Sequence, residues 1–494
     1  MKAREIVMCL PLSLALAWAF PSFGQSDRGA ITGTVKDQNG GVVPNAKVIA
    51  TNIDTGETRK TETGNEGAFT LSELKAASYR ITVEAAGFKT AAIDRIQLGV
   101  QIVRRVDVTL EAGAVSEKVT ITSEAPALQT DGPAQQLNVT ERQVRELPLL
   151  VAAESGGRSP LAFIFLDSSV VSNGATSSGT NATNFRINGS QGLGQDILID
   201  GAGTRRGENG TFFSEVAPGP NAFQEFTINT SNYSAEFGKS SGGVISFTIK
   251  SGGNDFHGEG YLYLINEAFN ANVALNRLTD LPRPRDRQKD FGFSVGGPVR
   301  LPKSVFGPLG YDGRNRTFFF FNYGGYRTAQ SESVEVSVPT ARMRNGDFSE
   351  LLTDPKILEF FGGPVRIYDP RMPAGQREAF PGNVIPESAI DPVGRNFINL
   401  FPLPNQTGPM GSTVFHNYRA ASNAVAETNY YVTKITQVLS SKQQLNFSST
   451  YRKLPSTKGG FPRFPEPFVA QGVWDQTFRS YYFRLQHDYA ITPR

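Results

Sequence analysis

The sequence predicts a mainly β protein: an export signal, a β-sandwich, a small α/β domain and the first strands of a transmembrane antiparallel β-barrel. Three observations support this fold class. Short segments alternate apolar with polar residues, turn signals are frequent, and no apolar stretch after the signal is long enough for a helical membrane span. Gly 50, Phe 35 and Tyr 15 are abundant and the mean hydropathy is only -0.27, which suits strands with one lipid-facing side.

The first residues are typical of an export signal, which we place at residues 1–24. A positive start precedes an apolar run from Val7 to Phe20, and small residues suited to cleavage follow. The run is too short for an ordinary membrane-spanning helix, and a retained anchor is the alternative. The single cysteine, Cys9, lies inside this signal. The mature chain therefore has no disulfide framework, zinc–thiolate site or cysteine nucleophile.

Residues 28–111 are predicted to form a β-sandwich. Short alternating segments with turn signals about every ten residues are typical of such strands. We expect strands at residues 31–35, 47–51, 58–63, 67–71, 79–83 and 106–110. The predicted core comprises the apolar residues at alternating positions: Phe69, Leu71, Tyr79, Ile81, Val83 and Leu110.

This segment resembles the carboxypeptidase regulatory-like domain, whose fold is transthyretin- or starch-binding-like. The resemblance is carried by residues 33–37, 43–46, Thr55, Gly56, 67–69, Leu74, Tyr79, Gly87 and Phe88. It implies an accessory domain, either a periplasmic spacer or a sugar-binding module. The histidines His257, His416 and His487 lie far apart and outside any zinc-protease motif. We therefore expect no peptidase activity, no other enzymatic activity, no metal and no cofactor.

Residues 112–255 are predicted to form a small mixed α/β domain. Thr140 and Gln143 have the spacing of a capping box, which predicts a short helix ending near Leu147. A stretch rich in Ser, Gly, Asn and Thr at 168–184 predicts a loop. Short strands ending in turns are expected at residues 185–189, 196–201, 227–230 and 241–253.

The same region resembles the plug domain of TonB-dependent receptors, and the alternative is an ordinary α/β domain whose glycines mark turns. The residues that match the motif, in addition to Glu225, are Asn188, Gly189, Asp200, Gly201, Glu236, Phe237, Gly238, Gly242, Gly243, Lys250, Ser251 and Gly252. The resemblance implies a plug that blocks a pore. It places substrate contacts in apical loops near residues 168–183 and 202–215.

The resemblance also implies a partner, TonB, which acts with its inner-membrane energising complex. TonB pairs with a short extended segment by strand addition, in which main-chain hydrogen bonds supply affinity. The candidate segment is Glu117, Lys118, Val119, Thr120, Ile121 and Thr122. The alternatives are a linker strand after the sandwich and the first strand of the plug.

Residues 256–494 are predicted to form barrel strands with an apolar, aromatic face toward lipid and a polar face toward water or the plug. We expect strands at 256–266, 288–299, 315–329, 427–438, 443–453 and 475–490. The long links follow the first, third and fifth strands, at residues 268–287, 330–426 and 454–474. They are external loops if the first strand enters from the periplasm. The link at 300–314 is long for a periplasmic turn.

This part resembles the Oar-like subgroup of TonB-dependent receptors, through residues 254–258, 292–298, 316–321, 326–327 and 346–349. The resemblance implies an outer-membrane protein of a Gram-negative-type bacterium, in contact with outer-membrane lipid, with its N-terminal domain in the periplasm. Its function would be plug-gated uptake of a siderophore, an oligosaccharide or a peptide. A surface adhesion or structural protein, and a sensor or exporter, are the alternatives. With net charge +3 and no basic block, nucleic acid is not expected as a partner.

Six strands are too few to close a barrel around a plug, since plug-bearing outer-membrane transporters have roughly 22 strands. An open edge in lipid leaves unpaired backbone groups at a cost of several kcal/mol each. We therefore expect this sequence to be the N-terminal part of a longer protein. The alternative is that several chains share one barrel.

Overall fold

The structure is a computed structural model of residues 1–494. It describes residues 28–113, 118–122, 135–146, 160–172, 185–191, 194–206, 210–211, 218–233, 237–238, 240–272, 274, 277, 283–373, 375–440, 442–458 and 474–489. The predicted signal lies outside these residues. Within the described residues, none of the helices has both the length and the apolar character needed to cross a membrane.

The N-terminal part is a β-sandwich, as the sequence predicts. One sheet contains β1 (Gly29–Asp37), β4 (Ala68–Leu74), β7 (Val103–Arg105) and β8 (Val108–Leu110). The other has the order β3-β2-β5-β6-β9, with β2 at Lys47–Asn52, β3 at Thr58–Glu62, β5 at Ala77–Glu84, β6 at Thr90–Leu98 and β9 at Lys118–Thr122. All six predicted core residues are buried between these sheets.

The sequence prediction omits β6, and a bulge explains why. The register between β5 and β6 shifts between Tyr79 and Ile81, and Arg95 in β6 has φ +60°. The bulge interrupts the strict alternation by which strands are recognised in a sequence. β9 also lies beyond the predicted end of the sandwich at residue 111, yet it pairs in parallel with β6.

The central unit, residues 135–249, is a small α/β fold around one sheet of order β10-β17-β18-β13-β14. These strands are β10 (Gln135–Thr140), β13 (Asp196–Ile199), β14 (Ala202–Gly203), β17 (Phe223–Ser231) and β18 (Val244–Ile249). Outside this sheet lie α2 (Glu141–Glu146), η2 (Pro160–Leu166), η4 (Pro220–Ala222), and the pairs β11 (Val170–Ser172) with β12 (Phe185–Ile187) and β15 (Arg205–Arg206) with β16 (Gly210–Thr211).

The predicted capping box of the central unit is confirmed at the start of α2. The Thr140 N–H donates to Gln143 Oε1 at 2.9 Å, and the Gln143 N–H donates to Thr140 Oγ1 at 3.5 Å. Each side chain thus satisfies a backbone donor that the first helical turn leaves unpaired. The helix therefore begins where the sequence predicts it.

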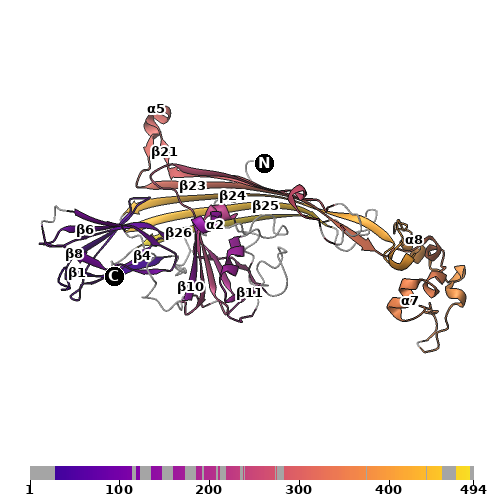
Figure 1. The fold of residues 1–494 in the computed structure, drawn as a ribbon. Coiled ribbons are helices and arrows are strands. Elements are labelled where there is room, and N and C mark those ends of the chain that lie inside the picture. Colours follow the sequence, from indigo (N-terminus) through magenta and orange to yellow (C-terminus); the bar gives the residue numbers. More distant parts are fainter. Residues whose placement is uncertain are drawn as a thin grey trace.

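The wall sheet is an antiparallel meander of six long strands, in the order β19-β20-β23-β24-β25-β26 (Figure 1). Its strands are β19 (His257–Ile265), β20 (Asp286–Pro298), β23 (Thr317–Val336), β24 (Tyr418–Ser440), β25 (Gln443–Lys458) and β26 (Trp474–Tyr489). Each matches a predicted strand. In the described residues the sheet is open, with β19 and β26 at its edges, and the central unit packs against one of its faces.

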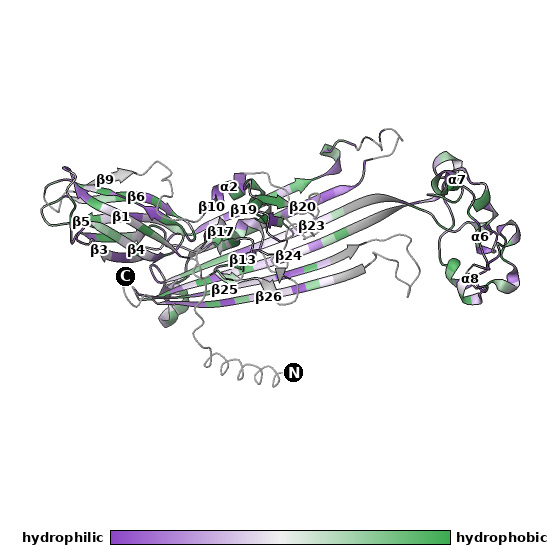
Figure 2. Cartoon of the chain, turned by 90° about the horizontal axis from the view of Figure 1, so that it is seen from below, coloured by the Kyte–Doolittle hydropathy of each residue, from purple (hydrophilic) through white to green (hydrophobic). Residues whose placement is uncertain are grey.

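Alternation along the wall strands follows the predicted pattern (Figure 2). In β26, Tyr481 and Phe483 are 61% and 67% exposed on the outer face, whereas Tyr482 and Arg484, at the alternate positions, are only partly exposed. An aromatic row crosses the outer face through directly paired residues. Its members are Phe293, Tyr323, Tyr431, Tyr451 and Tyr481, with neighbouring ring centroids 4.9–6.0 Å apart. An apolar, aromatic outer face is the surface that lipid favours.

The link between β23 and β24, predicted as one external loop at 330–426, is shorter and folded. The strands extend to Val336 and from Tyr418, and the residues between them form the helical unit, with α6 (Ala341–Arg344), α7 (Pro355–Phe361) and α8 (Pro392–Ile398). Asp354 and Asp391 cap α7 and α8. The helical unit and the sandwich lie at opposite ends of the wall sheet (Figures 1 and 2).

The link at 300–314, long for a turn, also has structure of its own. It contains the hairpin of β21 (Arg300–Leu301) and β22 (Tyr311–Asp312), with α5 (Lys303–Phe306) and η6 (Gly307–Leu309) at its tip. It projects at the same end of the wall sheet as the sandwich (Figure 1).

Candidate functional site

The motif residues of the central unit form its turns and its contacts with the wall sheet. Asn188 and Gly189 follow β12 with φ +50° and +74°, and Asp200 and Gly201 follow β13 with φ +48° and +79°. Asparagine, aspartate and glycine tolerate this left-handed conformation best. Of the other motif residues, Glu236 lies outside the described residues.

The remaining glycines of the motif allow close approach. A Cβ on Gly242 would lie 2.3 Å from Ser190 Oγ, and a Cβ on Gly252 would lie 2.3 Å from the carbonyl oxygen of Phe319 in β23. Gly243 has φ +96°. Phe237 is buried in a small cluster with Leu198 and Val244, beside Gly238. These glycines therefore bring the chain against its neighbours where any side chain would collide.

A buried ion pair joins the central unit to the wall sheet. Lys434 of β24 donates from Nζ to Asp200 Oδ1 at 3.2 Å and to the carbonyl oxygen of Ile249 at 2.9 Å. The two side chains are 9% and 1% exposed. Among the described residues, Asp200 Oδ2 is buried without a hydrogen-bond partner. Sequence reasoning identified Asp200 but not Lys434, because their contact spans more than two hundred residues.

A second connection is formed by Lys250 at the end of β18. Its Nζ lies 2.9 Å from Glu141 Oε1 in α2 and 3.5 Å from Glu259 Oε2 in β19. Asn221 also donates to Glu259 Oε1 at 3.1 Å. Lys250 therefore bridges the central unit and the first wall strand, close to the point where the chain passes from one to the other.

A tyrosine of the wall is seated between two glycines. Tyr430 of β24 is buried in the core of the central unit, together with Phe320 and Val432 of the wall. A Cβ on Gly219 or on Gly324 would lie 1.9 Å from an atom of the Tyr430 ring or its hydroxyl. The central unit and the wall therefore share one hydrophobic core.

The sandwich docks on the central sheet through the turn after β6. The Val100 N–H donates to Glu225 Oε1 at 2.6 Å, and Thr227 Oγ1 donates to the Val100 carbonyl oxygen at 3.3 Å. Gln101 hydrogen bonds to Asn229 and Ser246. Val100 is fully buried. Sequence analysis missed this contact, and the apolar Val100 after Gly99 is the only local signal.

Burial raises the pKa of Glu225 to about 7, while the hydrogen bonds from the Val100 N–H and the Asn138 side chain act in the opposite direction. The carboxyl therefore changes charge near neutral pH at the contact between sandwich and central unit. A buried carboxylate in an apolar sheet is costly unless hydrogen-bonded.

The proposed TonB-contacting segment forms β9 from Lys118 to Thr122, whereas Glu117 lies outside the described residues. β9 pairs in parallel with β6, and in the sheet order it stands at the end. β9 is therefore a strand of the sandwich sheet, and its contact with TonB stays a prediction. Its outer edge carries no strand among the described residues.

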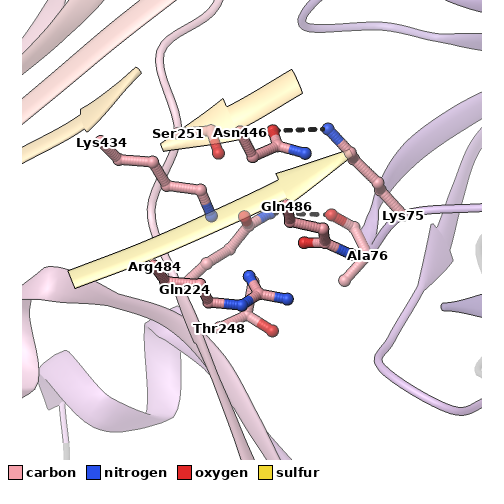
Figure 3. Close-up of a pocket in the computed structure, with 9 residues that line it drawn as sticks. All are labelled: Lys75, Ala76, Gln224, Thr248, Ser251, Lys434, Asn446, Arg484 and Gln486. Atoms are coloured by element: carbon pink, nitrogen blue, oxygen red, sulfur yellow. Dashed lines mark hydrogen bonds between the residues drawn. The ribbon is translucent and has the colours of Figure 1, made fainter. Parts of the chain in front are cut away.

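A cavity of about 40 Å³ lies where sandwich, central unit and wall meet (Figure 3). It is lined by Lys75 and Ala76 of the sandwich, Gln224, Thr248 and Ser251 from the central unit and the segment after it, and Lys434, Asn446, Arg484 and Gln486 of the wall. No group of three or more metal-ligating His, Cys, Asp or Glu side chains occurs within the described residues.

Comparisons with known proteins agree with one another on the family of this chain. A family model described as an outer membrane beta barrel domain matches residues 248–494, half of the chain, and one described as a carboxypeptidase regulatory-like domain matches residues 30–111. The TonB-dependent transporter Oar of Myxococcus xanthus is 27% identical over 308 residues, covering 60% of this chain and 27% of that protein. The chain thus spans about a quarter of the length of this curated relative.

Two solved structures are similar over most of this chain. The outer membrane transporter YddB from Escherichia coli is 12% identical with a TM-score of 0.38, covering 72% of this chain and 37% of that one. A mutant ferric enterobactin receptor from Pseudomonas aeruginosa is 13% identical with a TM-score of 0.36, covering 71% and 38%. The family-model match over half the chain establishes that this chain belongs to the outer-membrane β-barrel family, a relative of the Oar transporter located in the outer membrane.

Proposed function

We propose that the protein is a TonB-dependent transporter whose central unit, within residues 112–255, is the plug that gates a pore. One observation carries this proposal: the core of the central unit is completed by side chains of the wall, with Tyr430 and Val432 fully integrated in it. A domain that merely preceded a barrel would have a closed core of its own. The curated relative is a transporter, and no enzymatic activity is proposed.

Opening such a plug requires that its contacts with the wall be broken. These contacts include the ion pair of Asp200 with Lys434, the bridge from Lys250 to Glu259 and the hydrogen bond from the Tyr482 hydroxyl to the Ala202 carbonyl oxygen. They come from different wall strands. We propose that a pull on the N-terminal side of the plug releases them together, which opens a path for a siderophore, an oligosaccharide or a peptide.

TonB is proposed to deliver that pull by strand addition to β9. The strand is short and its residues alternate between polar and apolar. It lies at the end of its sheet, next to β6. Its outer edge, on which no strand lies within the described part of the chain, offers the main-chain donors and acceptors that a second strand needs. TonB pairing at this edge would leave the contact with β6 in place and load the sandwich and the plug at once.

Two neighbouring proline substitutions test this assignment. In a parallel pair the N–H groups of successive residues point to opposite sides of the strand. Val119→Pro and Thr120→Pro therefore remove one N–H facing β6 and one facing the outer edge. If TonB pairs with β9, energised uptake is abolished in the variant that lost the outer donor, while its membrane insertion and sandwich stability are unchanged. The other variant destabilises the sandwich.

Uptake is measured in cells with radiolabelled or fluorescent substrates, screened across ferric siderophores, oligosaccharides and peptides. In the same strains, site-specific crosslinking of β9 to TonB reports the contact directly. Normal uptake in both proline variants, together with no crosslink between β9 and TonB, would place TonB elsewhere. Uptake in a strain lacking TonB would refute TonB-dependent transport itself.

A further inference from the structure

The junction cavity between sandwich, plug and wall carries an excess of positive charge. Its lining residues include Lys75, Lys434 and Arg484 and no carboxylate. Three carboxylates lie near the lining and have cationic partners of their own. Asp488 accepts from Arg28, Asn446 and Gln486, Asp200 is paired with Lys434 of the lining, and Glu57, which also acts on Lys75, is paired with Arg59. The Lys75 ammonium donates to the neutral Asn446 side chain at 3.2 Å.

A buried hydroxyl provides an independent observation. Thr248 is 8% exposed and lines the cavity, and its Oγ1 is buried without a hydrogen-bond partner among the described residues. Figure 3 shows it among the residues that line the cavity, which include Arg484. Leaving a buried hydroxyl unsatisfied costs roughly 1–3 kcal/mol, so native proteins usually supply a partner.

The size and chemistry of the cavity limit what it can hold. Since a single water needs roughly 10–15 Å³ of such space, about 40 Å³ accommodates a group of a few heavy atoms. Three cationic side chains, several amides and a hydroxyl favour an anion with several acceptor oxygens, because charge-assisted hydrogen bonds are the strongest available. A metal cation would be repelled, and a sugar is too large.

We propose that this cavity binds a small tetrahedral oxyanion, inorganic phosphate or sulfate, held by Arg484 of the wall, Lys75 of the sandwich and Thr248 of the plug, with Lys434 beside it. The bound anion joins the three parts by one set of charge-assisted hydrogen bonds. Sandwich, plug and wall are then held together more tightly when the anion is present. This site differs from the substrate contacts expected in the apical loops near residues 168–183 and 202–215.

Lys75 provides a signature for the site. Burial, together with the nearby cations Arg28 and Lys434, lowers its pKa to about 7, while the carboxylates of Glu57 and Asp488 act in the opposite direction. An anion in the cavity favours the charged ammonium, so binding is accompanied by proton uptake and weakens as the pH rises through about 7. Sulfate does not titrate near neutral pH, so the pH dependence of its binding reports on the protein alone.

The test is titration calorimetry on the protein extracted from the outer membrane in detergent, with sulfate and inorganic phosphate at constant ionic strength. We expect one saturable site. Arg484→Gln and Lys75→Gln weaken binding at least about tenfold, and Lys75→Gln also removes the pH dependence of sulfate binding. Thr248→Val weakens it several-fold, whereas Thr248→Ser retains it. The control is Arg479→Gln, which removes an exposed cation from the same strand and leaves the affinity unchanged.

Three outcomes would overturn the proposal. The first is the absence of a saturable site in the folded wild-type protein. The second is equal weakening by Arg479→Gln and Arg484→Gln, which indicates general ionic attraction. The third is competition by a lipid headgroup. Short-chain phosphatidic acid is titrated in parallel, because competition by it would identify the phosphate of a lipid headgroup as the ligand and contradict a site for the free ion. Thermal melting of each variant establishes that it is folded before its binding is compared.

Discussion

The sandwich and the central unit are both built on β-sheets but differ in how each completes its core. Every buried residue of the sandwich cluster lies between Ile31 and Leu110, so this domain closes its core with its own two sheets. The core of the central unit includes Phe320, Tyr430 and Val432 from the wall sheet. The sandwich is thus a self-contained domain, whereas the central unit depends on the surface against which it packs.

Isolated fragments give the largest expected difference. Residues 28–122 expressed alone fold cooperatively, because their core is complete at a size at which domains are independently stable. Residues 135–250 alone lack part of their core and do not show a cooperative unfolding transition. Circular dichroism during heating measures both. A cooperative transition of the second fragment would show that the wall side chains are dispensable to its core.

Removal of a buried charge is the next largest effect. Lys434→Met leaves Asp200 uncompensated and destabilises the seating of the central unit by about 3–5 kcal/mol, and Asp200→Asn restores part of the loss. In the sandwich, Arg80→Ala removes the exposed pair with Asp94 and costs at most about 1 kcal/mol. Hydrogen exchange of the β17 and β18 amides measures the effect of Lys434→Met on the central unit. Thermal melting of the sandwich measures the effect of Arg80→Ala. Equal effects would contradict the proposed dependence on the wall.

Filling a glycine at the wall contact has a smaller effect. Gly219→Ala collides with Tyr430 and destabilises the central unit by about 1–3 kcal/mol. Gly64→Ala in the sandwich is the matched control, since the nearest atom to its new Cβ is 3.9 Å away. Limited proteolysis of the membrane-inserted protein compares the two. Rescue of Gly219→Ala by Tyr430→Leu would locate the effect at this contact, and failure of that rescue with unchanged folding would place it elsewhere.

The smallest effect concerns the contact between the two regions. Because the pKa of Glu225 is raised to about 7, docking is stabilised by the neutral carboxyl. That contribution is complete below the ordinary pKa of a glutamate and is lost as the pH rises through about 7. Between about pH 6 and pH 8 we expect a loss of about 1 kcal/mol. Exchange of the Val100 amide measures it, and Glu225→Gln abolishes the pH dependence. A pH dependence that survives this substitution would assign it to another group.

The sequence predicts well wherever a strand alternates regularly between two environments. The six wall strands and the sandwich core around Phe69, Tyr79 and Ile81 follow from alternation alone. The sequence does not predict β6, because the bulge near Arg95 breaks that alternation. The sequence also does not predict the helical unit between β23 and β24, because this segment has no clear periodic pattern. It is stabilised by the caps of Asp354 and Asp391 and by buried amide contacts such as those of Asn383.

The sequence by itself determined the family, the outer-membrane location and the positions of the turns, because glycine, asparagine and alternating apolar residues act locally. The tertiary structure alone decided which side chains meet. Lys434 is an ordinary lysine in a strand until it lies against Asp200, and Val100 is an ordinary turn residue until it reaches Glu225. Such pairs are set by how three folded parts pack, and no local pattern encodes contacts between residues more than a hundred positions apart.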